Sequence, residues 1–130
     1  MLTRCGADTA YRSGYAVFTG QRAKPRRWAR KPAPSPLGVP EDAARIGQAN
    51  YEEHLEQLKE CDLVIEAIAE RMDWKLDLYR KIAQHLAPHA IVASNTSGLS
   101  INALSEALPE EIKPRFCGIH FFNPPRYMAL

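Results

Sequence analysis

Leu63-Val64-Ile65-Glu66-Ala67-Ile68 is the stretch that decides the fold. A near-continuous apolar run of this length is typical of a strand covered on both faces of a parallel sheet. Ala90-Ile91-Val92-Ala93-Ser94 repeats the pattern, and 116–122 is a third candidate, rich in aromatic and β-branched residues and bounded by Pro114 and Pro124. The sequence thus predicts three short buried strands.

Helical patterns separate these strands. Asp73 can cap a helix that runs to about Leu86, with an apolar face at helical spacing. Ser100 can start a shorter helix that Pro109 ends. Strand, helix, strand, helix, strand with buried strands predicts an α/β fold, a parallel sheet with right-handed crossovers.

Three further features precede the first of these strands. Residues 45–49 are a candidate short strand, and Asn50 with Glu53 has the spacing of a capping box. An acidic surface helix is therefore expected over 51–60.

Residues 1–36 differ in composition from the rest of the chain. Residues 1–31 hold eight basic side chains and one acidic, a balance of +7, whereas the remaining 99 residues hold nine basic and 14 acidic, a balance of −5. Five of the ten prolines fall between Pro25 and Pro40, which favours an extended connector. We expect residues 1–36 to be irregular, apart from a strand-like piece at 15–19, and a domain to occupy 37–130.

Three accounts of residues 1–36 are open. A mitochondrial transit peptide is one, because the segment is Arg-rich and nearly acid-free, and it would move the expected location from a bacterial cytoplasm to the matrix. A basic arm is another, although nucleic-acid binding is not expected from a short Arg run without a recognisable fold. We favour a segment foreign to the domain, because its pattern disagrees with that of residues 37–130. No apolar run has the length needed to cross a membrane.

Polar residues follow each of the three predicted strands. They are Glu66 and Glu70, then residues 94–98, then His120 and Asn123. Ligands of open parallel sheets bind beyond the carboxyl ends of the strands, so these residues predict one shared site. Taken singly, each has a structural reading, such as a buried acid with a partner, a turn-forming loop or a core histidine.

The residue types at this edge favour alcohol oxidation. A histidine can take a proton from an alcohol, and nearby hydroxyls and amides can hold the oxygen whose charge changes. The spacing of Cys, His and acidic residues predicts no metal site, and the Gly-x-Ser-x-Gly turn of a serine hydrolase is absent.

Three motifs carry a resemblance to a known family. Residues 62–75, Asp-Leu-Val-Ile-Glu-Ala-Ile-Ala-Glu-Arg-Met-Asp-Trp-Lys, are followed by Ala-Ser-Asn-Thr-Ser at 93–97 and Gly-Ile-His-Phe-Phe-Asn-Pro at 118–124. Together, over roughly 36–130, they closely resemble the NAD-binding domain of 3-hydroxyacyl-CoA dehydrogenases, particularly bacterial fatty-acid β-oxidation members. The resemblance implies the second half of a Rossmann-type parallel sheet with flanking helices, NAD as cofactor, an acyl-CoA substrate and homo-oligomeric full-length relatives.

The resemblance also implies roles for matching residues. His120 is the catalytic base that removes the proton from the 3-hydroxyl, and Ser97 hydrogen-bonds the reacting oxygen. Asn123 supports the loop after His120 and the bound substrate. The implied cofactor contacts are Asn95 and Ser97 beside the nicotinamide, and Glu70 and Lys75 at its ribose.

The chain departs from the family's pattern in two ways. None of its seven glycines belongs to a Gly-x-Gly-x-x-Gly turn, so the pyrophosphate cradle is not expected. The family's histidine pairs with a glutamate in the next strand, and Leu130 ends this sequence just before the position expected for it. We expect a partial domain that is inactive alone, an expectation that rapid oxidation of NADH with acetoacetyl-CoA would contradict.

The family function predicted is therefore NAD-dependent oxidation of (S)-3-hydroxyacyl-CoA to 3-ketoacyl-CoA in fatty-acid β-oxidation. One alternative is a non-catalytic interaction module, whose basic arm predicts salt-sensitive retention on DNA or heparin. The other is a related β-hydroxyacid dehydrogenase with a small carboxylate substrate, although such relatives usually act through a lysine.

Overall fold

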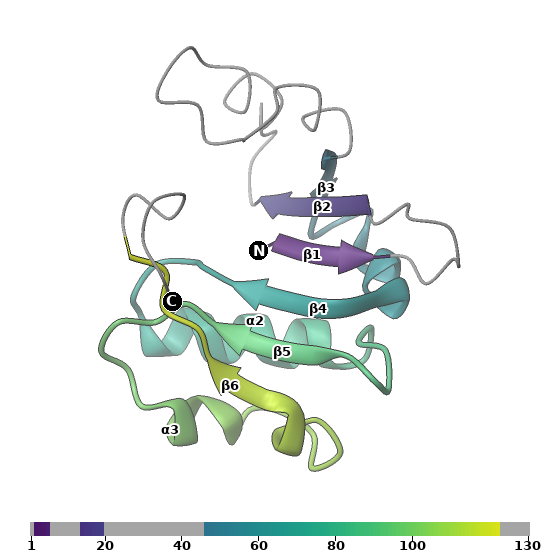
Figure 1. Cartoon of the computed structure of the whole chain (residues 1–130). Helices are drawn as coiled ribbons and strands as arrows, with labels where there is room; N and C mark the ends of the chain where they lie inside the picture. Colours follow the sequence, from purple (N-terminus) through teal and green to yellow (C-terminus); the bar gives the residue numbers. More distant parts are fainter. Residues whose placement is uncertain (1, 6–13, 20–45, 123–130) are drawn as a thin grey trace.

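The computed structural model describes residues 2–5, 14–19 and 46–122, and its strands form one six-stranded sheet (Figure 1). The strand order is β3-β2-β1-β4-β5-β6. The strands are β1 (Leu2–Cys5), β2 (Gly14–Thr19), β3 (Ile46–Asn50), β4 (Cys61–Glu66), β5 (Ile91–Ser94) and β6 (Phe116–Gly118). The helices are α2 (Met72–Ala83) and α3 (Ile101–Ser105), with short 3-10 helices η2 (Leu55–Glu60) and η3 (Lys113–Arg115).

The predicted parallel half of the sheet is confirmed. β4 pairs with β5 and β5 with β6, both in parallel. The register sets Glu66 opposite Ser94 and Ser94 opposite Gly118, so the last residues of the three strands lie side by side. The polar residues that follow these strands therefore all start from one edge.

The third strand is shorter and more exposed than the sequence predicts. A buried strand over 116–122 was expected, but β6 ends at Gly118, and both Cys117 and Gly118 are exposed. That expectation is wrong because β6 lies at the end of the strand order, where the described residues supply only β5 as a partner. His120 thus lies two residues beyond the strand.

The other half of the sheet contains one reversed strand. β1 runs antiparallel to both β2 and β4, as the arrows in Figure 1 show. β2 and β3 are parallel to each other. The strand order is that of the doubly wound dinucleotide-binding sheet, 3-2-1-4-5-6, in which the central strand is parallel to its neighbours. Reversing β1 points its carboxyl end away from the edge where the carboxyl ends of β4, β5 and β6 meet.

The expectation of an irregular segment at 1–36 is wrong for residues 2–5 and 14–19. The strand-like piece at 15–19 is confirmed as part of β2, but β1 was not foreseen. β1 pairs with β4 along Leu2–Cys5, and such pairing satisfies backbone groups that an edge strand leaves open. The boundary expected between residues 36 and 37 lies outside the described residues.

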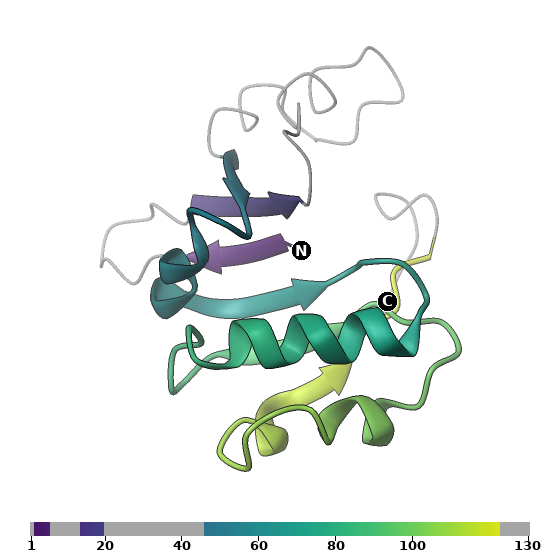
Figure 2. The same ribbon diagram turned by 180° about the vertical axis from the view of Figure 1, so that it is seen from behind.

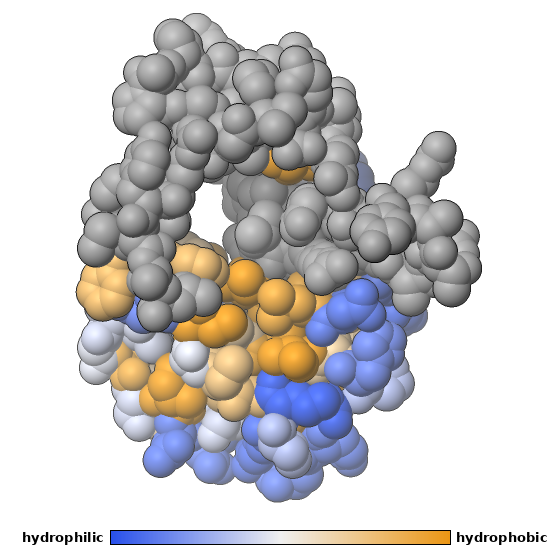
Figure 3. All heavy atoms as spheres, in the orientation of Figure 1, coloured by the Kyte–Doolittle hydropathy of each residue, from blue (hydrophilic) through white to orange (hydrophobic). Residues whose placement is uncertain are grey.

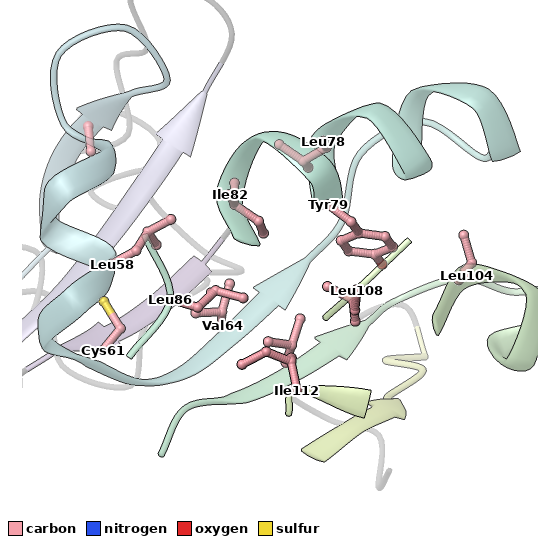
Figure 4. Packing of buried hydrophobic residues seen from close by; sticks show 12 residues of the cluster. Leu58, Cys61, Val64, Leu78, Tyr79, Ile82, Leu86, Leu104, Leu108 and Ile112 are labelled. Carbon is pink, nitrogen blue, oxygen red and sulfur yellow. The ribbon is translucent and has the colours of Figure 1, made fainter. Parts of the chain in front are cut away.

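The helices cover one face of the sheet. Figure 1 shows α2 behind the strands, and Figure 2, from the opposite side, shows α2 and α3 in front. Tyr79 and Ile82 of α2 are fully buried and lie over Val64 of β4 (Figure 4). Val92 of β5, also fully buried, belongs to the same apolar cluster. Gly118 permits close approach of α3 to β6, because a Cβ there would lie 3.1 Å from Cδ1 of Ile101.

The predicted helix starts are partly right. Ser100 caps α3, its Oγ accepting from Ala103 N at 3.2 Å. Asp73 does not cap α2: the capping position is Arg71, and Asp73 lies in the first turn, bound by the Arg71 guanidinium. α2 ends at Ala83 rather than near Leu86.

The segment after β3 forms a turn and then η2 instead of the helix expected over 51–60. Asn50 still caps the turn, since its Oδ1 accepts from Glu53 N at 2.7 Å. Its backbone N–H, which a capping box would pair with Glu53, donates to Nδ1 of His54 instead.

The face away from the helices gathers apolar side chains over the described strands (Figure 3). Ile91 of β5 is one of the large apolar residues that are exposed, at 46%. Parallel sheets of α/β proteins are ordinarily covered on both faces. None of the described helices is long and apolar enough to span a bilayer.

Candidate active site at the carboxyl edge of the parallel strands

Ser97 and His120 meet at this edge although 23 residues separate them in sequence. Ser97 Oγ lies 2.9 Å from Nε2 of His120, and both side chains are exposed. The Phe122 ring meets the imidazole edge to face, with centroids 5.1 Å apart. A hydroxyl and an imidazole therefore face solvent together, hydrogen-bonded and accessible to a ligand.

Backbone contacts on both sides of His120 tie it to the end of β5. Ile119 N donates to Ser94 O at 2.9 Å, and Phe121 N donates to Oδ1 of Asn95 at 2.9 Å. The first bond continues the β5–β6 ladder, and the second uses a side chain in its place. His120 is thus held although it lies beyond the strand.

Glu70 holds the loop that carries Ser97. Its Oε1 accepts from Oγ1 of Thr96 at 2.5 Å and from the N–H groups of Ser97 and Gly98 at 2.9 Å each. The Thr96 hydroxyl, followed by the Gly98 N–H, lowers the pKa of Glu70 to about 2. The loop is thus organised around one oxygen of a carboxylate that is 43% exposed.

We expect Glu70→Gln to weaken the dependence of stability on acid. The pKa of Glu70 is about 2 in the folded chain against an ordinary 4.5, so its contribution is present above about 4.5 and is lost as pH falls toward 2. In that window the unfolded chain binds about one more proton at this residue. Urea unfolding between pH 2.5 and 6 gives the free energy of unfolding as a function of pH. In the Gln variant, the slope of that dependence should be smaller by an amount equivalent to about one proton. An unchanged slope would contradict this account of the loop.

A fully buried polar cluster lies beneath the edge. Lys75 Nζ donates to both oxygens of Glu66 at 2.8 and 2.9 Å, and the hydroxyls of Ser94 and Tyr79 donate to Oε2 at 2.7 and 2.9 Å. Ile68 N adds a bond of 2.5 Å to Oε1. The carboxylate, at the end of β4, thus has partners from β5, from α2 and from the segment that follows β4, which fixes the strand ends against the helix.

The pKa values in this cluster follow from burial and bonding. Burial alone raises the pKa of Glu66, but the bonds from Lys75, Ser94, Ile68 N and Tyr79 outweigh it and lower that pKa below its ordinary value. Burial, with the nearby Glu66 charge, raises the pKa of Tyr79. The reading of Glu66 as a buried acid with a partner is confirmed.

Lys75 lies deeper than the other predicted site residues. Ser97, His120, Glu70 and Asn95 lie together at the edge, but the Lys75 amine is fully buried below them. Nζ is 4.0 Å from Oε2 of Glu70 and also donates to Ile68 O at 3.3 Å. Lys75 therefore forms a buried ion pair with Glu66 beside Glu70, and the ribose contact that the resemblance implies stays a prediction.

The sequence did not reveal the roles of two residues, Thr96 at the edge and Tyr79 in the buried cluster beneath it. Thr96 bridges Glu70 and the N–H of Leu99, and Tyr79 bonds Glu66. Tyr79 lies on the predicted apolar face of α2, where only its hydroxyl indicated a buried partner.

Asn123 lies outside the described residues. Within the described part of the chain, no group of three His, Cys, Asp or Glu side chains could hold a metal ion.

The chain matches known proteins over most of its length. Residues 20–130 match the family model described as 3-hydroxyacyl-CoA dehydrogenase, NAD binding domain. A protein of Rickettsia felis, named as a fatty acid oxidation complex trifunctional enzyme, is 50% identical over 100 residues, or 77% of this chain and 14% of that protein. The mitochondrial hydroxyacyl-coenzyme A dehydrogenase of Sus scrofa is 45% identical over 69 residues, covering 53% of this chain and 21% of that enzyme.

Solved structures agree with this match. The (S)-3-hydroxybutyryl-CoA dehydrogenase PaaH1 of Ralstonia eutropha has a TM-score of 0.62 at 38% identity, over 70% of this chain and 31% of that one. FadB2 of M. tuberculosis has a TM-score of 0.68 at 25% identity, over 87% of this chain and 42% of that one. The chain spans far less than two thirds of these proteins' lengths. By the match over residues 20–130, it belongs to the family of 3-hydroxyacyl-CoA dehydrogenase NAD-binding domains.

Proposed function

We propose that this chain supplies the reacting centre of an NAD-dependent 3-hydroxyacyl-CoA dehydrogenase. The reaction is oxidation of (S)-3-hydroxyacyl-CoA to 3-ketoacyl-CoA in fatty-acid β-oxidation. The observation that supports it most is the 2.9 Å contact between Ser97 Oγ and His120 Nε2 at the carboxyl edge of the sheet. Family membership indicates the reaction class. The imidazole and the hydroxyl in this contact are the groups that such a reaction needs for proton transfer and for binding the reacting oxygen.

The proposed chemistry divides between the two side chains. NAD, when bound, accepts the hydride that leaves C3 of the substrate. His120 takes the proton of the 3-hydroxyl at Nε2, and Ser97 donates a hydrogen bond to the same oxygen. The substrate hydroxyl can join the two because their side chains already face each other and solvent.

The fit of this edge to NAD is uneven. On the nicotinamide side, Glu70 commits Oε1 to the loop and presents an exposed carboxylate whose other oxygen can accept from ribose hydroxyls. Ser97 N donates to the same carboxylate, and Lys75 Nζ lies 4.0 Å from its other oxygen, Oε2. Asn95, Ser97 and Lys75 are the further cofactor contacts of the proposal. On the pyrophosphate side the sequence has no Gly-x-Gly-x-x-Gly, and the carboxyl end of β1 points away. The nicotinamide side fits the cofactor and the pyrophosphate side does not.

Other parts of the proposal rest on the relatives. An acyl-CoA substrate and homo-oligomeric assembly of the full-length protein follow from the family. A bacterial cytoplasm is the proposed location, or the mitochondrial matrix if residues 1–31 are a transit peptide. Asn123 is proposed to support the segment after His120 and the bound substrate.

Titration of the purified chain with nicotinamide compounds tests the proposal. Because only the nicotinamide side fits, NADH and reduced nicotinamide mononucleotide should bind with similar affinity and shift the amide resonances of Ser97, Gly98 and Phe121. AMP should leave these resonances in place. Ser97→Ala with His120→Ala should reduce binding of both nicotinamide compounds, whereas His89→Ala, at the opposite end of β5, serves as the matched control.

Two outcomes would overturn the proposal. One is that AMP, but neither nicotinamide compound, shifts resonances at this edge. The other is that the chain ignores all three compounds and instead binds heparin in a salt-sensitive manner, the result expected of a basic interaction module.

A further inference from the structure

We infer that Asn95 is a positioning residue that holds His120 in register through the carbonyl oxygen of its side chain. The resemblance implies a different role, a contact with nicotinamide. This role rests on the proposed function only in that His120 is taken as the reacting base. The hydrogen bond from Phe121 N to Asn95 Oδ1, on which the role depends, can be tested without any ligand.

Two structural requirements conflict at the end of β5. The backbone has to leave the sheet so that residues 96–98 can form the loop bound by Glu70. The segment 119–121 must nevertheless stay beside β5 for His120 to reach Ser97. A main-chain ladder cannot extend along a strand that has already turned away.

The Asn95 side chain resolves this conflict. Ile119 N donates to the main-chain carbonyl of Ser94, and Phe121 N, two residues on, donates to the side-chain carbonyl of Asn95. N–H groups two residues apart in an extended segment point the same way, so these two bonds form successive rungs on one side. Asn95 Oδ1 thus substitutes for the carbonyl that a longer β5 would have offered.

Asn95 is itself firmly placed. Its backbone N–H donates to Glu66 O at 2.7 Å, which links it to the end of β4, and its residue is half-buried. The orientation of its amide follows from its partner, because an N–H donor requires the oxygen and not the nitrogen. The bond to Phe121 therefore connects β4, β5 and the His120 segment across 26 residues of sequence.

Two substitutions of similar size separate this role from a cofactor contact. Asn95→Asp keeps an acceptor for Phe121 N but removes the side-chain N–H₂ donor. Asn95→Leu removes both. A positioning role through Oδ1 predicts that the hydrogen bond from Phe121 N survives in the Asp variant and is lost in the Leu variant. A role that depends on the N–H₂ group predicts that the Asp and Leu variants are affected to the same extent.

The test uses the purified chain in solution. In the parent, a scalar coupling across the hydrogen bond should join Phe121 N to Cγ of Asn95, and Phe121 N–H should be protected from exchange. Asn95→Leu should speed exchange at Phe121 by about five- to tenfold, as expected for loss of one hydrogen bond. It should also change the ¹⁵N shift of His120 Nε2, which reports the bond to Ser97. Asn95→Asp should retain the protection and the Nε2 signal.

Failure of this inference is distinguishable from failure of the proposed function. If Phe121 exchanges equally fast in the parent and the Leu variant, or if Asp behaves like Leu, the positioning role is wrong. If Leu speeds exchange at amides throughout the sheet, its effect is global and the inference is likewise overturned. Absence of nicotinamide binding to the parent would instead count against the proposed function and leave the coupling to Asn95 intact.

Discussion

Replacing Lys75 with methionine should lower the free energy of unfolding by about 3–5 kcal/mol, the cost of removing one partner from a buried ion pair. Lys75 and Glu66 are both fully buried, and Nζ contacts both carboxylate oxygens. Methionine keeps the length of the side chain but leaves the Glu66 charge in a dry site with only neutral donors. Urea unfolding monitored by fluorescence and by circular dichroism measures the change.

Two further variants make that prediction specific. Lys81→Met, on the same helix but exposed, should change stability by less than about 1 kcal/mol. Glu66→Gln combined with Lys75→Met removes both charges and should cost less than the sum of the two single changes, because neither buried charge is left unpaired. Additive costs in this cycle would contradict the ion pair as the basis of the effect.

Replacing His120 with alanine should abolish nearly all turnover where turnover can be measured. The expected loss in kcat is about 10²- to 10⁴-fold, the usual contribution of a positioned acid–base group. A suitable host is the Rickettsia felis relative, with its matching 100-residue segment exchanged for that of this chain, since the two are 50% identical there. Reduction of acetoacetyl-CoA, followed by the loss of NADH absorbance, gives the rate.

Two further variants in the same host, one at the proposed centre and one control, are compared with the His120 variant. Ser97→Ala should reduce kcat by about 10²- to 10³-fold if its hydroxyl stabilises the reacting oxygen. His89→Ala changes an exposed histidine that contacts Asp62 at the amino end of β5 and should leave kcat unchanged. Retention of more than a tenth of the activity by the His120 variant would exclude it as the base.

Local sequence patterns predicted the parallel half of the sheet well. The apolar run at 63–68 and the run at 90–94 correspond to β4 and β5 because a strand covered on both faces carries apolar side chains at successive positions, and the last three residues of each strand are all buried. The convergence of Ser97 and His120 followed from the topology alone, since parallel strands in register end at one edge.

The features that the sequence did not reveal depend on long-range contacts. Asn95 stands in a loop, and nothing local indicates that its side chain bonds Phe121, 26 residues away. Lys75 was expected at the ribose of the cofactor, and its burial is set by Glu66 on another element. The exposure of β6 depends on its place in the strand order, which periodicity does not encode.

The reversed β1 is the largest difference from the expected Rossmann-type architecture. Strand propensity depends on context and carries no information on direction, so the antiparallel pairing of β1 with β4 could not be predicted from Leu2–Cys5 alone. Its consequence agrees with the missing glycine turn: the carboxyl end of β1 points away from the edge where β4, β5 and β6 end, and the sequence has no Gly-x-Gly-x-x-Gly.

The most direct test of the proposed reacting centre is an intermolecular nuclear Overhauser experiment on the purified chain with reduced nicotinamide mononucleotide. The hydrogens on C4 of the ring, one of which is the transferable hydride, should show contacts to the Ser97 β-hydrogens and to the His120 imidazole hydrogens. Contacts from C4 exclusively to residues away from the carboxyl edge of β4, β5 and β6 would contradict the assignment of Ser97 and His120 to the reacting centre.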